Sequence, residues 1–163
     1  MISAIAKFYD PLGWLSPVII TVKIFIQKLW LCNLDWDDGL PLELKDEFLN
    51  WYSQVSVLNN IKINRSLNYS LESKCKIFGF AVASKIAFGA CVCLKITFQG
   101  TSVKLVQAKP KVAQIKPLLT IPRLELNAAV LLARLTVRVI CALKLLPDNV
   151  FLYTDSIRRA VFL

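Results

Sequence analysis

The sequence predicts an α/β protein: an N-terminal helical segment followed by a mixed sheet whose elements occur in the order β-β-β-α-β. Apolar residues recur at steps of three and four before residue 57, whereas between residues 76 and 108 they follow the period of two that is typical of strands. A long apolar helix pattern and one more short β-rich run come after them. The polar stretch 59–69 separates the two parts, so we expect a helical segment over residues 1–60 and an α/β segment over residues 61–163.

The helical segment is expected to contain two amphipathic helices, over residues 16–34 and 42–56. Ser16 followed by Pro17 matches an N-cap and a first helical residue. The apolar faces would be formed by Val18, Val22, Phe25 and Leu29 in the first helix and by Leu44, Phe48, Trp51 and Val55 in the second. The acidic run Asp35-Trp-Asp-Asp38 between the helices is interpreted as a solvated loop rather than a cation site.

The sheet is expected to begin with a meander of three strands. These strands are predicted over residues 76–84, 87–98 and 102–108. A basic connector over residues 109–117 would lead to the long helix. Cys91 and Cys93 lie two residues apart and therefore on one face of the second strand, where core packing is the expected role.

The long helix is predicted over residues 122–146, with Pro122 in its first turn. Its solvent-facing stripe would contain Asn127, Arg134 and Arg138. Glu125 lies on the opposite side, where a carboxylate is costly unless it is paired or binds a cation. The alternative is a glutamate near the start of a helix that is stabilised by the helix dipole.

A second carboxylate, Asp155, ends the strand predicted over residues 149–155. A helix with an inward glutamate and a strand ending in an aspartate can bring two oxygen ligands together, and oxygen is what Mg²⁺ prefers. Glu125 and Asp155 are therefore candidate metal ligands and catalytic residues of a two-metal phosphodiester hydrolase.

Charge is distributed unevenly along the chain, whose net charge is +9. Residues 1–60 contain 4 Lys/Arg and 7 Asp/Glu, whereas residues 61–163 contain 16 and 4. This bias favours a polyanionic partner such as nucleic acid, with a merely solvated basic surface as the alternative. The candidate nucleic-acid-binding residues flank the start of the long helix: Lys109, Lys111, Lys116 and Arg123.

Composition narrows the other classes of function. Two apolar stretches, 15–34 and 124–146, carry internal charges, so no membrane partner is expected. Histidine, the commonest general base and zinc ligand, is absent. Five cysteines without a signal-peptide pattern predict reduced thiols and an intracellular protein, cytoplasmic or nuclear. Hydrophobic residues make up 56% of the chain, so some apolar surface is expected to pack against other parts of a larger protein.

Several multi-residue words in this sequence resemble, in order and spacing, the pol polyprotein of Pao/BEL-type LTR retrotransposons, in the segment often labelled the Pao retrotransposon peptidase family. The words are Phe8-Tyr-Asp-Pro-Leu-Gly13 with Ser16-Pro17, Lys23 and Gln27-Lys-Leu-Trp30, Asp35-Trp-Asp-Asp38, Ala108-Lys-Pro-Lys-Val-Ala113, Ile121-Pro-Arg-Leu-Glu-Leu126 and Tyr153-Thr-Asp-Ser156. They cover nearly the whole chain. The resemblance implies a connection segment from the end of the reverse transcriptase over residues 1–60, then a truncated ribonuclease H-like domain over residues 61–163.

The resemblance also implies a function and a set of site residues. Such domains use Mg²⁺ to hydrolyse the RNA strand of RNA/DNA hybrids, and their partners are nucleic acid and the remainder of the pol polyprotein. The family's first catalytic aspartate lies in a Phe-x-Asp-Ala-Ser word, which here reads Phe80-Ala-Val-Ala-Ser84, so Val82 occupies that position. The second and third carboxylates map to Glu125 and Asp155, and the fourth would lie beyond Leu163.

Val82 offers no oxygen to a metal ion. We therefore expect a catalytically inactive remnant, a pseudoenzyme that binds Mg²⁺ weakly or not at all. Two alternatives remain open: a nuclease that is completed by a partner or by missing sequence, and a non-catalytic interaction fragment. An aspartic peptidase is disfavoured, because Asp155-Ser156 is followed by Ile157 rather than glycine and no second such word occurs.

Overall fold

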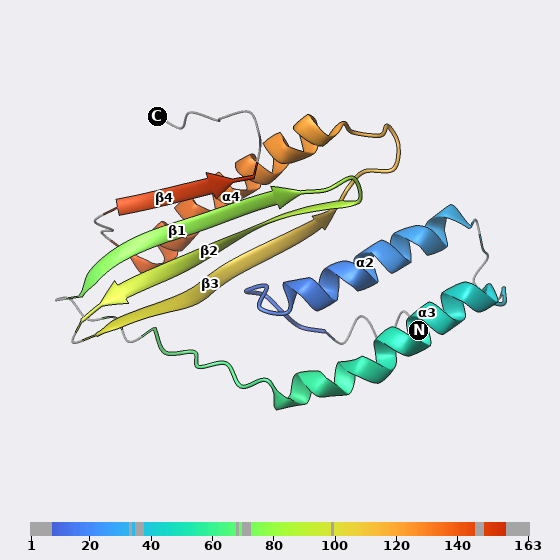
Figure 1. The fold of residues 1–163 in the computed structure, drawn as a ribbon, viewed down its shortest axis with the longest axis horizontal. Helices are drawn as coiled ribbons and strands as arrows, with labels where there is room; N and C mark the ends of the chain where they lie inside the picture. The colour runs from blue at the N-terminus through green and yellow to red at the C-terminus, as the bar shows by residue number, and fades with distance from the viewer. Residues whose placement is uncertain are drawn as a thin grey trace.

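The computed structural model describes residues 8–32, 34, 38–67, 69, 73–98, 100–145 and 149–155. Its centre is a four-stranded sheet with the order β3-β2-β1-β4 (Figure 1). The strands are β1 (Lys74–Ala83), β2 (Ala87–Thr97), β3 (Thr101–Val112) and β4 (Asn149–Thr154). β1, β2 and β3 form an antiparallel meander, and β4 pairs parallel with β1. The predicted α/β class and the order β-β-β-α-β are confirmed.

Helix α4 (Ile121–Leu143) connects β3 to β4 and packs on one face of the sheet, behind it in the view of Figure 1. The two core-facing rows on the strands are Cys75, Ile77, Gly79 and Ala81 in β1 and Ala90, Val92, Leu94 and Ile96 in β2. The helix meets them with Leu124, Ala128, Leu131, Leu132, Leu135 and Val139, all buried. The predicted solvent stripe of this helix, Asn127, Arg134 and Arg138, is exposed. We call the opposite side of the sheet the open face.

By length and composition α4 is the one helix among the described residues that could cross a membrane. Its buried side is instead packed on β1 and β2, as expected of a core helix. The helix ends at Lys144, whose left-handed φ of 49° allows its N–H to reach back to the carbonyl oxygens of Ile140 and Cys141. The absence of a membrane partner stays a prediction.

The N-terminal helices lie beside β3 (Figure 1). They are α2 (Ser16–Leu31) and α3 (Leu42–Val55), the latter followed by the short 3₁₀ helix η1 (Ser56–Asn60). The backbone N–H of Ala108 in β3 donates to the carbonyl oxygen of Leu12 at 2.8 Å, so the N-terminal turn occupies part of the outer edge of β3. Phe25 of α2 packs against Phe48 of α3, with ring centroids 5.8 Å apart. The division of the chain at residue 60 stays a prediction.

Three local expectations were wrong. Ser16 is the first residue of α2 rather than its N-cap; the carboxylate of Asp10 instead accepts hydrogen bonds from the N–H groups of Trp14 (2.9 Å) and Leu15 (2.7 Å). β3 does not end at residue 108 but continues through Pro110, because an edge strand tolerates a residue without an N–H. The residues 35–37 of the acidic loop lie outside the described residues.

The third error concerns Cys91 and Cys93. We expected them in the core, but both are half-buried on the open face. The core positions of β2 are taken by the alternate residues, among them Val92 and Leu94, which are fully buried. Strand alternation then directs both cysteines away from α4.

The closest contact between α4 and the sheet predicts a sensitive position. A methyl group on Gly79 would come within 2.6 Å of Leu132 Cδ1 and 2.7 Å of Leu152 Cδ2. We expect Gly79→Ala to lower the free energy of unfolding by about 1–3 kcal/mol, because a packed core resists added volume. Urea unfolding followed by circular dichroism measures this change. Gly39→Ala is the matched control, since nothing lies within 4 Å of its added methyl group; equal effects of the two substitutions would contradict the packing argument.

Candidate functional site

Val82 and Asp155 occupy equivalent positions on neighbouring strands. The register of β1 and β4 pairs Ala81 with Thr154, so Val82 and Asp155 come next along the two strands. Adjacent strands are about 4.8 Å apart. Two residues earlier, the rings of Phe80 and Tyr153 stack on the open face with centroids 5.4 Å apart. Side chains two residues apart share a face, so Val82 and Asp155 belong to the open face as well.

Glu125 reaches the same end of the sheet from α4. Leu132 lies over Gly79, and α4 runs back along β1 in the opposite direction (Figure 1). Seven residues towards the start of α4 cover about 10 Å, which leads from Leu132 to Glu125. Three residues towards the end of β1 cover a similar distance of about 10 Å, which leads from Gly79 to Val82. The fold therefore gathers Val82, Glu125 and Asp155 at one end of the sheet, with Glu125 half-buried.

The groups gathered there do not fit a two-metal centre. Val82 is 57% exposed and contributes only apolar atoms. It lines a groove of about 290 Å³ together with Pro17 and Ile20 of α2 and Pro110 of β3. Within the described part of the chain, no group of three or more His, Cys, Asp or Glu side chains could hold a metal ion. The catalytic roles of Glu125 and Asp155 stay predictions, and no step can be derived through bound Mg²⁺.

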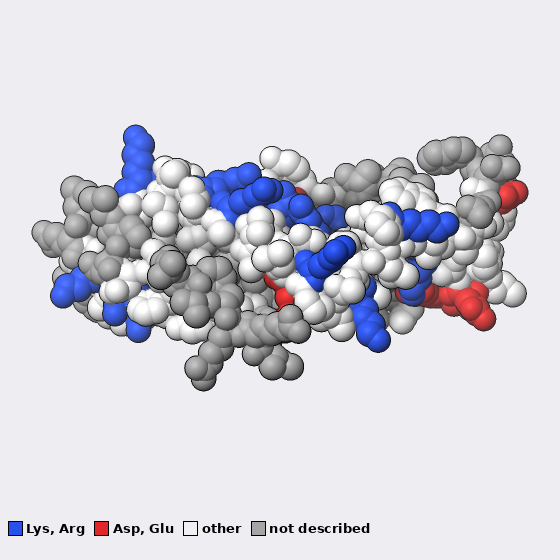
Figure 2. Space-filling view, turned by 90° about the horizontal axis from the view of Figure 1, so that it is seen from above, with Lys and Arg blue, Asp and Glu red and all other residues white. Residues whose placement is uncertain are grey.

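The four candidate nucleic-acid-binding residues follow the chain from β3 into α4, and all four are exposed. Lys109 and Lys111 lie opposite Ala90 and Phe88 in the register, so they point to the α4 side of the sheet. The connector is anchored at the tip of the β1–β2 hairpin, where the N–H of Ala113 donates to the carbonyl oxygen of Ile86 at 2.8 Å. Lys116 lies on this connector and Arg123 in the first turn of α4. Figure 2 shows many more basic than acidic side chains on the upper side of the molecule.

The open face carries a feature that the sequence analysis missed. Aromatic rings of β1 and β4 form two stacked pairs across the parallel register, Phe78 with Phe151 (5.2 Å) and Phe80 with Tyr153 (5.4 Å). Lysines follow at the other end of the same face. The signal was available as every second residue of β1, which reads Lys74, Lys76, Phe78, Phe80 and Val82. Only the pairing of β4 with β1 shows that the rings of the two strands meet.

Cys91 and Cys93 form a polar pair on this apolar face. A hydrogen bond from the thiol of Cys93 lowers the pKa of Cys91 from its ordinary 9.0 to about 7, against the effect of burial, which raises it. The same hydrogen bond and burial raise the pKa of Cys93. Cys91 therefore has the thiolate character of a reactive cysteine near neutral pH.

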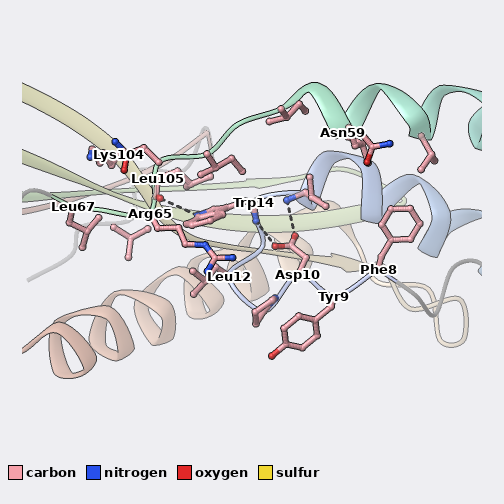
Figure 3. A pocket seen from close by; sticks show the side chains of 18 of the residues that line it. Phe8, Tyr9, Asp10, Leu12, Trp14, Asn59, Arg65, Leu67, Lys104 and Leu105 are labelled. Carbon is pink, nitrogen blue, oxygen red and sulfur yellow. Dashed lines mark hydrogen bonds between the residues drawn. The ribbon is translucent and has the colours of Figure 1, made fainter.

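A larger cavity of about 850 Å³ lies between the N-terminal turn, the stretch 55–67 and β3 (Figure 3). Trp14 spans it, with its indole N–H donating to the carbonyl oxygen of Leu105 at 3.2 Å. Arg65 and Lys104 bring the positive charges of its lining, while Asp10 is engaged at the start of α2. None of the candidate catalytic positions lines this cavity, so it is separate from the end of the sheet where they gather.

The fold and the gathered positions define a ribonuclease H-like domain. Comparison with known protein families agrees: the family described as "Pao retrotransposon-like RNaseH-like domain" matches residues 1–156. The chain belongs to this family, and the resemblance seen in its sequence words is confirmed. No curated protein and no solved structure matches the chain.

The thiol pair gives a direct test of the open-face geometry. We expect Cys93→Ala to raise the pKa of Cys91 well above 7, because the hydrogen bond that stabilises its thiolate is lost while its burial remains. The rate of Cys91 alkylation by iodoacetamide at pH 7 should then fall roughly tenfold or more. Mass spectrometry of the labelled peptides across pH 6–10 measures it, with Cys141→Ala as the control. An unchanged pH profile would show that the two thiols do not interact.

Proposed function

We propose that this chain is a ribonuclease H-like domain of a Pao-type retrotransposon polyprotein that still binds nucleic acid but does not cleave it. The observation that carries the proposal is Val82, which places a branched apolar side chain beside Asp155 where the family has a catalytic aspartate. Two-metal hydrolysis depends on carboxylates that hold both ions beside the attacking and leaving oxygens. Glu125 and Asp155 alone do not supply that set.

The binding part of the proposal rests on charge and position. Lys109, Lys111, Lys116 and Arg123 are exposed and follow one another around the end of the sheet. Lysine and arginine on such a surface bind phosphates without reading sequence. A nucleic-acid ligand is consistent with action inside the cell, in the cytoplasm or the nucleus.

The polyprotein part of the proposal rests on apolar surface. Leu126, Val130 and Val137 on the outer side of α4 are between 41% and 64% exposed. Apolar side chains concentrated on one exposed helix face mark a surface that other protein covers. The rest of the same polyprotein is the partner that the family implies.

Catalysis is tested by restoring the lost carboxylate. We expect no hybrid-specific RNA cleavage by the unmodified chain with Mg²⁺ or Mn²⁺, and no rise in its melting temperature when Mn²⁺ is added. Val82→Asp should produce a Mn²⁺-dependent rise, because a ligand that binds only the folded state stabilises it. Val82→Asn, which has nearly the same shape but no charge, is the matched control. Robust cleavage by the unmodified chain that is abolished by Glu125→Gln would overturn the proposal in favour of a working nuclease.

The binding surface is tested by salt dependence. If all four basic residues contact phosphates, replacing them with alanine should flatten the slope of log K against log[salt] on an RNA/DNA hybrid by about 3–4 units. Fluorescence anisotropy between 50 and 300 mM salt measures the slope. Lys23→Ala with Lys45→Ala, two exposed lysines of the N-terminal helices, serves as the control. An unchanged slope in the fourfold variant would mean that hybrids bind elsewhere.

A further inference from the structure

We propose that the open face of the sheet binds single-stranded nucleic acid, with bases stacking on the aromatic rows of β1 and β4 and phosphates contacting lysines at one end. This surface is distinct from the basic residues around the start of α4, which lie on the α4 side. It goes beyond the proposed function by assigning a second surface and a different ligand. It does not depend on whether the domain cleaves hybrids.

The aromatic rows are the first argument. Phe78 with Phe151 and Phe80 with Tyr153 lie nearly parallel, with interplanar angles of 15° and 17°. Phe80, Phe151 and Tyr153 are 46%, 36% and 48% exposed, so much of each ring stays available. Base–aromatic stacking on such rings is tolerant of sequence, because every base has a π-face.

The lysines are the second argument. Lys76 of β1 and Lys95 of β2 lie directly opposite each other on the open face, with Lys74 two residues further along β1. Like charges placed opposite each other destabilise a sheet. None of the three lysines forms an ion pair with the described residues, among which the ion pair seen is Lys28–Glu47. A polyanion bound between the lysines would remove this repulsion.

Charge and aromatic rings together select the ligand class. Four residues of strand, about 13 Å, separate Lys76 from Phe80, so one extended ligand can reach both. A duplex presents phosphates but keeps its bases stacked inside, whereas a single strand offers phosphates and free base faces together. Asp155 lies at the far end of the face from the lysines, and this polarity directs the phosphates of the ligand to the lysine end. An apolar protein segment would use the rings but leave the lysines facing each other.

The first test separates stacking from simple apolar contact. We expect the chain to bind fluorescein-labelled oligo(dT) and oligo(U) of 12 nucleotides, and Phe80→Leu with Tyr153→Leu to weaken binding at least tenfold. Leucine keeps the apolar bulk but cannot stack. Leu126→Ala on the outer side of α4 is the control, and circular dichroism checks that each variant is folded. Unchanged oligonucleotide affinity in the leucine variant would overturn the proposal.

The lysines are tested by salt dependence on the same oligonucleotides. Replacing Lys74, Lys76 and Lys95 with alanine should flatten the salt slope by about 2 units, since each phosphate contact on a single strand contributes about 0.7. The fourfold variant at Lys109, Lys111, Lys116 and Arg123 should affect hybrids more than single strands. The opposite pattern would place single strands on the α4 side and overturn the proposal, leaving the hybrid surface intact.

A thiol footprint locates the ligand. Cys91 lies opposite Phe80 in the register, whereas Cys32 and Cys141 are exposed at the end of α2 and near the end of α4. Saturating oligo(dT) should slow the alkylation of Cys91 by iodoacetamide severalfold and leave Cys32 and Cys141 unchanged. Cys91 that stays equally reactive would contradict the proposal. Cys91 that is shielded by raising the protein concentration, with no effect of oligo(dT), would identify the open face as a protein interface instead.

Discussion

The contact of α4 with the sheet at Gly79 and Leu132 is the constraint on which the rest of the structure depends. Leu132 can lie on β1 because the strand has no side chain at Gly79, where even a methyl group would be 2.6 Å from Leu132 Cδ1. Through this contact the helix buries one face of β1 and β2. It also sets how far α4 extends along β1, which brings Glu125 level with Val82.

The same packing divides the surface of the domain into two chemically different sides. On the α4 side, exposed lysines and an arginine follow the chain from β3 into the helix, suited to the phosphates of a duplex. On the open face, stacked aromatic rings and facing lysines are suited to a ligand with free bases. A domain without a complete set of catalytic carboxylates can therefore still recognise nucleic acid in two ways, and the two surfaces can be separated by mutation.

The candidate site could be predicted in part because its residues lie in local words. Glu125 follows the helix start at Pro122, and Asp155 ends a short β-rich run, so each was visible without tertiary structure. Val82 was recognised through the resemblance of Phe80-Ala-Val-Ala-Ser84 to a family word. The stacked pairs on the open face were missed, because β4 is separated from β1 by more than sixty residues and only their pairing brings Tyr153 against Phe80.

The sequence by itself determined the element order, the solvent-facing stripe of α4, the family and the apolar residue at the position of the first catalytic aspartate. These features depend on local periodicity and on short words, which a chain carries whatever its neighbours are. The tertiary structure decided which face of each strand is covered. Strand alternation offers two faces, and both faces of β2 carry apolar residues, so pattern alone placed Cys91 and Cys93 in the core. The docking of α4 selects the face of Val92 and Leu94, because a helix buries the face whose side chains leave it room, and this choice left the cysteines beside the open aromatic rows.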